Sequence, residues 1–145
     1  MADREHALSH LYTRLMDSKH GYEQALERAE SPYIKGVFTD MIDRRSRNAM
    51  QIKQFLAGMG HETSDDGSTL AAAHRAFLSL KDRVTGHGDE AVLQEVLRGE
   101  ETLDKAYHEA MEAAGPTDPE HAFLREQHES LKGKIDELRA RAKTA

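Results

Sequence analysis

Apolar residues recur every three or four positions along most of the chain, a spacing that predicts long amphipathic helices. Between residues 3 and 29 this pattern consists of Leu8, Leu11, Leu15, Tyr22, Ala25, Leu26 and Ala29. From residue 32 to residue 59 it consists of Ile34, Val37, Phe38, Met41, Ile52, Phe55, Leu56 and Met59. Each of these helices would be about 38 Å long at the usual rise of about 1.5 Å per residue.

Turn-forming residues mark the ends of these two helices. Glu30, Ser31 and Pro32 interrupt the apolar pattern. Ser31 is a good N-cap for the second helix, and Pro32 suits its first turn. Gly58 and Gly60 are of the type that commonly ends a helix. Two long helices joined by so short a turn are expected to form an antiparallel hairpin.

The second half of the chain repeats this arrangement, with helices expected over residues 89–113 and 118–142. Asp89 is a suitable N-cap for the first of them, and the segment GPTDP at residues 115–119 predicts a tight turn between the two. The apolar positions are Val92, Leu93, Val96, Leu103, Tyr107, Ala110 and Met111, followed by Leu124, Leu131, Ile135 and Leu138. These helices are expected to form a second antiparallel hairpin.

The connection between the hairpins decides the topology. A shorter helix is expected over residues 68–84, packed on the long helices through Leu70, Phe77 and Val84. At about 24 Å it is long enough to cross most of a bundle, as in ferritin-like folds, where the second and third long helices run parallel. The sequence therefore predicts one all-α domain over residues 1–145, a ferritin-like four-helix bundle of two hairpins joined by a long crossover. An up-down-up-down bundle with a decorated loop is the alternative.

Several short motifs are similar to those of a known family. They are Gly21-Tyr22-Glu23-Gln24-Ala25, Gly67-Ser68, His74-Arg75, and Arg98-Gly99-Glu100-Glu101 ahead of Tyr107. In order and spacing they resemble a bacterial family of four-helix-bundle domains of unknown function that is placed with the ferritin-like proteins. The similarity extends from about Leu8 to about Leu138. It implies the fold and no particular activity.

The composition narrows the possible functions. The chain has no cysteine, which excludes disulfides, thiolate metal sites and thiol nucleophiles. Its net charge is −6, and its densest basic run, residues 44–47, is short, so nucleic-acid binding is not expected. It has neither an apolar run of membrane-spanning length nor a secretory signal at its N-terminus. We therefore expect a cytoplasmic protein that does not bind membranes.

Polar residues interrupt the inward faces of all four long helices near their midpoints. These residues are Ser18 and Lys19, Arg45 and Asn48, Gly99 and Glu100, and Gln127 and His128. Since the midpoints of antiparallel helices lie at similar depth, the side chains are expected to form one polar layer across the bundle. Glu100 is expected to lie inside and pair with Arg45, so that the layer fixes the register of the helices.

A metal site is the alternative interpretation of this layer. Ferritin-like enzymes hold two metal ions with a Glu from each of two helices and Glu-x-x-His from each of the others. The second helix has no Glu-x-x-His, and Lys19 and Arg45 would repel cations, so a dimetal centre is not expected. A degenerate site is the remaining form, in which Glu23, Glu100 and His128 bind one iron or another divalent ion.

No catalytic residue is predicted, since the chain has no nucleophile motif and no glycine-rich phosphate loop. The first functional hypothesis is a non-catalytic helical bundle without a cofactor. It would act by self-association, with a dimer favoured, or by binding an unknown protein partner. The second is the degenerate iron-binding protein, and the third is a carrier that uses the polar layer as a small-ligand pocket. Most other histidines, including His108, are expected at the surface.

Overall fold

The computed structural model of the protein describes residues 2–61 and 89–144. These residues form four long helices: α1 (Ala2–Arg28), α2 (Pro32–Gly58), α4 (Asp89–Ala113) and α5 (His121–Thr144). The described part contains no strand. The all-helical class is thereby confirmed, while the helix expected over residues 68–84, with Leu70, Phe77 and Val84, lies outside the described residues.

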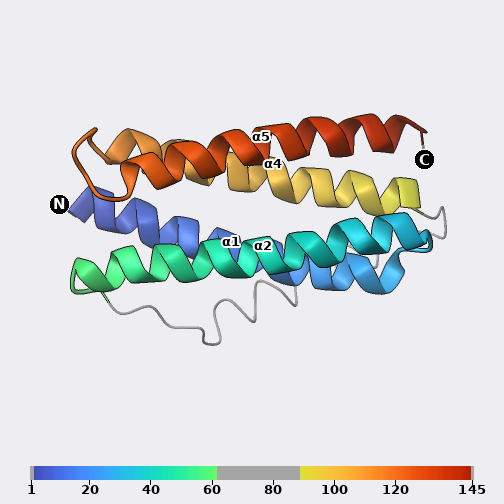
Figure 1. The fold of residues 1–145 in the computed structure, drawn as a ribbon, viewed down its shortest axis with the longest axis horizontal. Helices are drawn as coiled ribbons and strands as arrows, with labels where there is room; N and C mark the ends of the chain where they lie inside the picture. The colour runs from blue at the N-terminus through green and yellow to red at the C-terminus, as the bar shows by residue number, and fades with distance from the viewer. Residues whose placement is uncertain (1, 62–88, 145) are drawn as a thin grey trace.

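The long helices run side by side in two antiparallel pairs (Figure 1). α1 pairs with α2 and α4 pairs with α5, whereas α2 and α4 run in the same direction. A contact between helix ends fits this course, because Asp89 at the start of α4 lies against the turn that precedes α2. The expected parallel course of the second and third long helices is therefore present.

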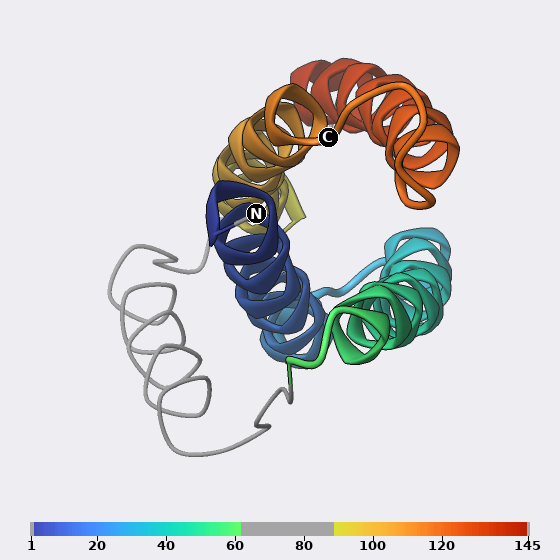
Figure 2. The same cartoon turned by 90° about the vertical axis from the view of Figure 1, so that its left-hand side faces the viewer.

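Seen end-on, the helices follow an arc in the order α2, α1, α4, α5 (Figure 2). α1 packs against both α2 and α4, and α4 packs against α5. α2 and α5 stand at the two ends of the arc, and their backbones are not closely packed on each other. The inner face of the arc carries the core.

The core consists of the apolar faces predicted from the helical spacing. Its largest fully buried side chains include Leu8, Leu11, Leu15, Phe38, Met41, Ile52, Leu56, Leu93, Leu103, Tyr107, Leu124 and Leu131. Burial of one such side chain contributes about 1.5–3 kcal/mol relative to leaving it in water. This face holds the helices together. No described helix is both long and apolar enough to cross a membrane.

The end of α2 shows why the chain turns there. Gly60 has a φ of +82°, a left-handed conformation that glycine adopts without steric cost. The amide of His61 donates to the carbonyl of Leu56 (2.9 Å), and the amide of Gly60 donates to that of Ala57 (3.0 Å). These two bonds form a Schellman motif, so the predicted glycine stop is confirmed.

The start of α2 differs from the expectation. Ser31 occupies the N-cap position and Pro32 follows it, but the Ser31 side chain makes no capping hydrogen bond. Asp89, expected to cap its own helix, is instead the first residue of α4. Its carboxylate accepts hydrogen bonds from the backbone amides of Glu30 (2.8 Å) and Ser31 (3.0 Å). A residue distant in sequence thus satisfies the amides at this helix start.

α5 begins at His121, three residues later than expected. The reason is that the turn extends through Glu120. Asp118 accepts a hydrogen bond from the amide of Gly115 (2.6 Å), and the amide of His121 donates to the Asp118 carbonyl (3.1 Å). Glu120 is fully buried and accepts two hydrogen bonds from Arg4 of α1, at 2.6 and 2.7 Å. This ion pair connects the turn to the first helix.

Candidate functional site

The centre of the arc contains a buried ion pair. Glu100 of α4 and Arg45 of α2 are 1% and 3% exposed, and the Nη2 of Arg45 donates to the Oε2 of Glu100. Ser18 of α1 lies between them, accepting from the Nε of Arg45 (3.1 Å) and donating to the Oε1 of Glu100 (3.2 Å). The expected burial and pairing of Glu100 and Arg45 are confirmed, and three helices meet at this cluster.

Arg45 keeps its positive charge despite being buried. Burial is the largest single influence on the pKa of Arg45 and lowers it, but the charge of Glu100, its hydrogen bond and the nearby phenols Tyr22 and Tyr107 together raise that pKa above its ordinary value. An arginine is therefore a fixed cation at this position. It can bind or orient an anion, but it cannot exchange a proton as a general base.

Two tyrosine hydroxyls lie beside the ion pair, one from α1 and one from α4. Tyr22 and Tyr107 are 2% and 0% exposed, and among the described residues neither hydroxyl has a hydrogen-bond partner of acceptable geometry. Burial, reinforced by the nearby charge of Glu100, raises the pKa of Tyr22 well above its ordinary value. Burial raises the pKa of Tyr107 to about 12, against the opposing charge of Arg45. Both phenols stay protonated at neutral pH.

The other members of the predicted layer lie at its edges. Asn48 of α2 and Gln127 of α5 line a pocket that also reaches Arg45. Lys19 is half-buried on α1, next to Ser18. His128 of α5 is buried, but its Nε2 lies 2.7 Å from the Oδ1 of Asp104. Its hydrogen-bond partner is therefore on α4, away from the Arg45–Glu100 pair.

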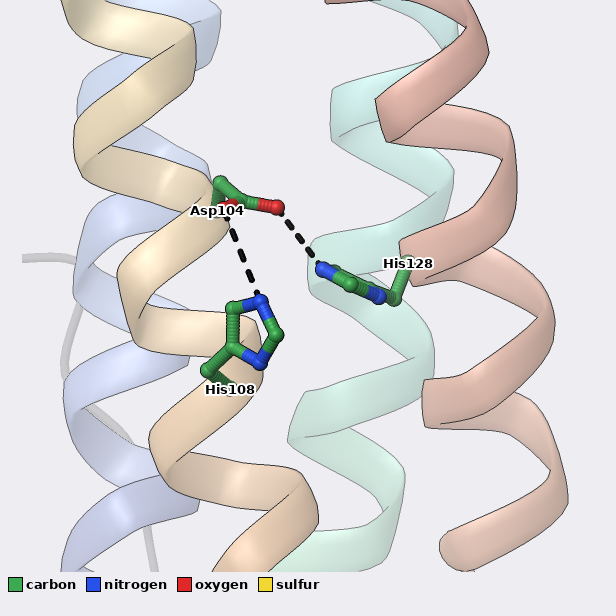
Figure 3. Close-up of side chains that lie close together, drawn as sticks. All are labelled: Asp104, His108 and His128. Atoms are coloured by element: carbon green, nitrogen blue, oxygen red, sulfur yellow. Dashed lines mark hydrogen bonds and ion pairs between the residues drawn. The ribbon is translucent and has the colours of Figure 1, made fainter.

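The three ligands of the alternative metal site have separate partners. Glu23 is partly exposed and contacts the Nδ1 of His20 at 2.9 Å. Glu100 is occupied by Arg45 and Ser18, and His128 faces Asp104 (Figure 3). The structure does not bring Glu23, Glu100 and His128 together as one set of ligand atoms.

A pocket of about 270 Å³ opens between α2 and α5 at mid-height. Two of its lining residues are apolar, Met41 and Leu131. The others are the cations Arg44, Arg45, Arg47 and Lys134 and the neutral hydrogen-bonding residues Asn48, Gln127 and Ser130. None of the lining residues that the structure describes is acidic, although the chain as a whole has a net charge of −6. The pocket wall is therefore built from cations and hydrogen-bonding groups.

Side chains close the arc above and below this pocket. Towards one end, Phe55 of α2 and Phe123 of α5 lie with ring centroids 5.7 Å apart. At the other end, the guanidinium of Arg141 lies 4.1 Å from the ring centroid of Tyr33 and donates to its hydroxyl at 2.7 Å. These two contacts join α2 to α5 at either end, so the pocket lies between two bridges.

The sequence pattern identified the layer but missed part of its surroundings. Tyr22 and Tyr107 fit the apolar spacing and were assigned to the core, which is correct for their rings and incomplete for their hydroxyls. Arg44 and Lys134 could not be identified from the sequence, because a charged residue between apolar positions of a helix is usually only solvated. Asp104 and His108 could have been found from their i, i+4 spacing, which places two side chains on one helix face.

A family model described as "Domain of unknown function (DUF2383)" matches residues 3–113. The matched segment includes Ser18, Arg45 and Glu100, and it ends with α4. Neither a curated protein nor a solved structure matches the chain significantly. The resemblance to a domain family of unknown function is thereby confirmed, and the function has to be argued from the geometry.

Proposed function

This chain belongs to the DUF2383 family of domains of unknown function, and we propose that it is a non-catalytic domain that binds a small polyanion in the pocket between α2 and α5. The ligand would carry phosphate or carboxylate groups. One observation supports this proposal above others: among the described residues, four cationic side chains and no acidic one line the pocket. Of the three hypotheses drawn from the sequence, this develops the small-ligand carrier.

Three of the four cations can turn to a ligand at little cost. Arg44 pairs with Asp40 (2.9 Å), Arg47 with Asp43 (2.8 Å), and Lys134 with Glu137 (3.0 Å), each one helical turn away. Pairs of this kind contribute about 0.3–0.5 kcal/mol each. A charge-assisted hydrogen bond to a ligand anion is worth about 1.5–3 kcal/mol. Exchanging one for the other is favourable.

Arg45 has a different part in the proposal. Its charge is already balanced by Glu100, so it would attract an anion only weakly. Its contribution would be a hydrogen-bond donor held in a fixed position in the pocket wall. The planar guanidinium suits the paired oxygens of phosphate and carboxylate. The neutral side chains of Asn48, Gln127 and Ser130 would provide the remaining hydrogen bonds.

The described surface supports recognition by charge more than by apolar contact. Its exposed large hydrophobic side chains are Tyr33 and Met50, 49% and 52% exposed. They are 17 positions apart on α2, about 25 Å along the helix, and Tyr33 is covered on one face by Arg141. Self-association through an apolar face finds less support here than a polar ligand in the pocket.

The parallel course of α2 and α4 supports a ferritin-like relationship for the fold, which we include in the proposal. The iron-binding form of that relationship is less favoured than the anion pocket. Arg45 occupies the centre of the layer, and a fixed cation there opposes binding of a divalent ion.

A bacterial origin of the protein stays a prediction.

Calorimetric titration with pyrophosphate and with citrate at low ionic strength tests the proposal. The wild type should bind at least one of them with one-to-one stoichiometry, and added salt should weaken binding because Arg44 and Arg47 are exposed to solvent. If only pyrophosphate binds, the ligand class is phosphate. If only citrate binds, it is carboxylate.

Charge reversal at one position should then separate the pocket from the rest of the surface. Lys134→Glu places a negative charge in the pocket wall, and we expect affinity to fall at least about tenfold, or about 1.4 kcal/mol. Lys132→Glu on the same helix changes the net charge equally but lies outside the pocket, so it should leave the affinity nearly unchanged. Equal losses in both variants, or no saturable binding by the wild type, would rule the proposal out.

A further inference from the structure

Three potential metal ligands converge between α4 and α5, apart from the pocket. Asp104 and His108 lie one turn apart on α4, and His128 faces them from α5 (Figure 3). One ligand atom from each residue lies within 4.8 Å of the other two. Within residues 2–61 and 89–144, this is the group of three or more metal-ligating side chains that comes together.

The distances between these potential ligand atoms are close to the distances between the ligand atoms of a bound metal ion. The Oδ1 of Asp104 is 2.7 Å from the Nε2 of His128, and its Oδ2 is 3.7 Å from the Nε2 of His108. Tetrahedral zinc with ligand bonds of about 2.0–2.1 Å holds its ligand atoms about 3.3 Å apart. The observed separations lie on both sides of this value, and rotation of the more exposed side chains would equalise them.

The side chains of the three residues differ in how freely they can move, because they are buried to different extents. The His128 side chain is 7% exposed, Asp104 is 28% exposed and His108 is 55% exposed. His128 is thus held in place from the inside, while the other two face solvent. A bound ion would keep at least one coordination position open to water on that side.

A hydrogen bond between His128 and Asp104 would satisfy His128 without any metal. It does not account for His108, whose exposed ring lies 4.4 Å from that of His128 in an edge-on arrangement. The nitrogens of both rings and the Asp104 carboxylate come together in Figure 3. Two imidazoles and a carboxylate suit zinc or ferrous iron, whereas magnesium prefers oxygen ligands alone.

We propose that Asp104, His108 and His128 form a binding site for one divalent transition-metal ion of the zinc or ferrous-iron class, with water in the open position. The site uses none of the pocket residues, so it stands or falls independently of the anion pocket. It also differs from the sequence-based metal hypothesis, with which it shares only His128.

Zinc titration of the full chain, expressed without a histidine tag, tests the proposal. We expect one zinc ion per chain, a higher melting temperature because the ion binds the folded state, and no comparable effect of magnesium. Cobalt should give the visible absorption of a tetrahedral or five-coordinate ion. Anaerobic titration with ferrous iron decides between the two ions of the class.

Two variants are chosen to disturb the fold little, because His108 faces solvent and the amide oxygen of Asp104→Asn can still accept a hydrogen bond from His128. Asp104→Asn and His108→Gln should each weaken zinc binding by about 10–100-fold or more, while their melting temperatures without zinc stay near that of the wild type. His20→Gln and Glu23→Gln, which each remove one member of the His20–Glu23 pair on α1, should leave the affinity unchanged. The proposal is overturned if the wild type does not bind zinc, or if both Asp104→Asn and His108→Gln bind it as tightly as the wild type does.

Discussion

At Glu100, a carboxylate removed from water is held by one guanidinium and one hydroxyl, from two different helices. The attraction within a buried ion pair mainly offsets the cost of removing both charges from water, so such a pair adds little net stability. Removal of one partner is expensive, since the other charge then remains buried alone. The pair therefore specifies how the helices align, because only one register of α2 against α4 brings Arg45 to Glu100.

The Arg45–Glu100 pair predicts that substitutions of its two members differ in their effect on stability. Arg45→Met leaves the Glu100 carboxylate without its cation and should lower the free energy of unfolding by about 3–5 kcal/mol. Glu100→Gln should cost less, because the amide oxygen can still accept from Arg45 while the amide nitrogen can donate to the Ser18 hydroxyl, whereas Met makes no hydrogen bond. Urea unfolding of both variants at neutral pH measures the difference. A larger loss for Glu100→Gln than for Arg45→Met would contradict this account of the pair.

The buried phenols predict loss of stability in alkali. Below pH 10 both the folded and the unfolded chain keep the Tyr107 proton. Between pH 10 and about 12 the unfolded chain loses the proton while the folded chain keeps it. The free energy of unfolding should then fall by about 1.4 kcal/mol per pH unit from this residue. Urea unfolding across this pH range should show a shallower decline for Tyr107→Phe, and an unchanged decline for the exposed Tyr33→Phe. If Tyr107→Phe declines as steeply as the wild type, Tyr107 is not the source.

At the scale of the elements, long-range contacts hold the helix ends where local capping does not. Asp89 of α4 binds the turn before α2, and Arg4 of α1 binds Glu120 in the turn before α5. The sequence predicted where α2 stops, since a glycine with positive φ is a local requirement. It missed the role of Asp89 and the late start of α5, because both depend on contacts between elements far apart in sequence.

The Arg4–Glu120 contact gives a prediction at this scale. Arg4→Met leaves a fully buried carboxylate without its two hydrogen bonds, and we expect the free energy of unfolding to fall by about 1.5–3 kcal/mol. Arg125→Met removes an exposed arginine from α5 and should change stability by less than about 0.5 kcal/mol. Equal effects in urea unfolding would show that Arg4 contributes only surface charge.

At the scale of the whole molecule, the arc explains which features were predictable. The apolar spacing predicted the core, because burial along one helix follows its own period. The Arg45–Glu100 pair was predictable because both residues interrupt that spacing at similar depth. The pocket was not predictable, because its width depends on how far α5 stands from α2. That distance depends on contacts such as Phe55–Phe123, which join helices remote in sequence.

The same arc offers an internal comparison for the proposed function. A second groove, of about 340 Å³, is lined by residues of α4 and α5. It contains three cations, Arg98, Arg139 and Lys143, but also the acidic Glu101. Because Glu101 is part of the groove wall, 3.4 Å from Arg139, its carboxylate would repel an anion bound there. If positive surface charge alone determined binding, anions would bind in both grooves. The proposal instead predicts binding in the pocket between α2 and α5.

The central claim, that a polyanion occupies the pocket between α2 and α5, is tested most directly by mapping pyrophosphate binding through backbone amide chemical shifts of the isotope-labelled chain. The account predicts saturable shifts concentrated at residues 41–48 of α2 and 127–134 of α5, with one binding constant. Shifts concentrated instead around Arg98, Arg139 and Lys143, or no saturable shifts at all, would contradict it.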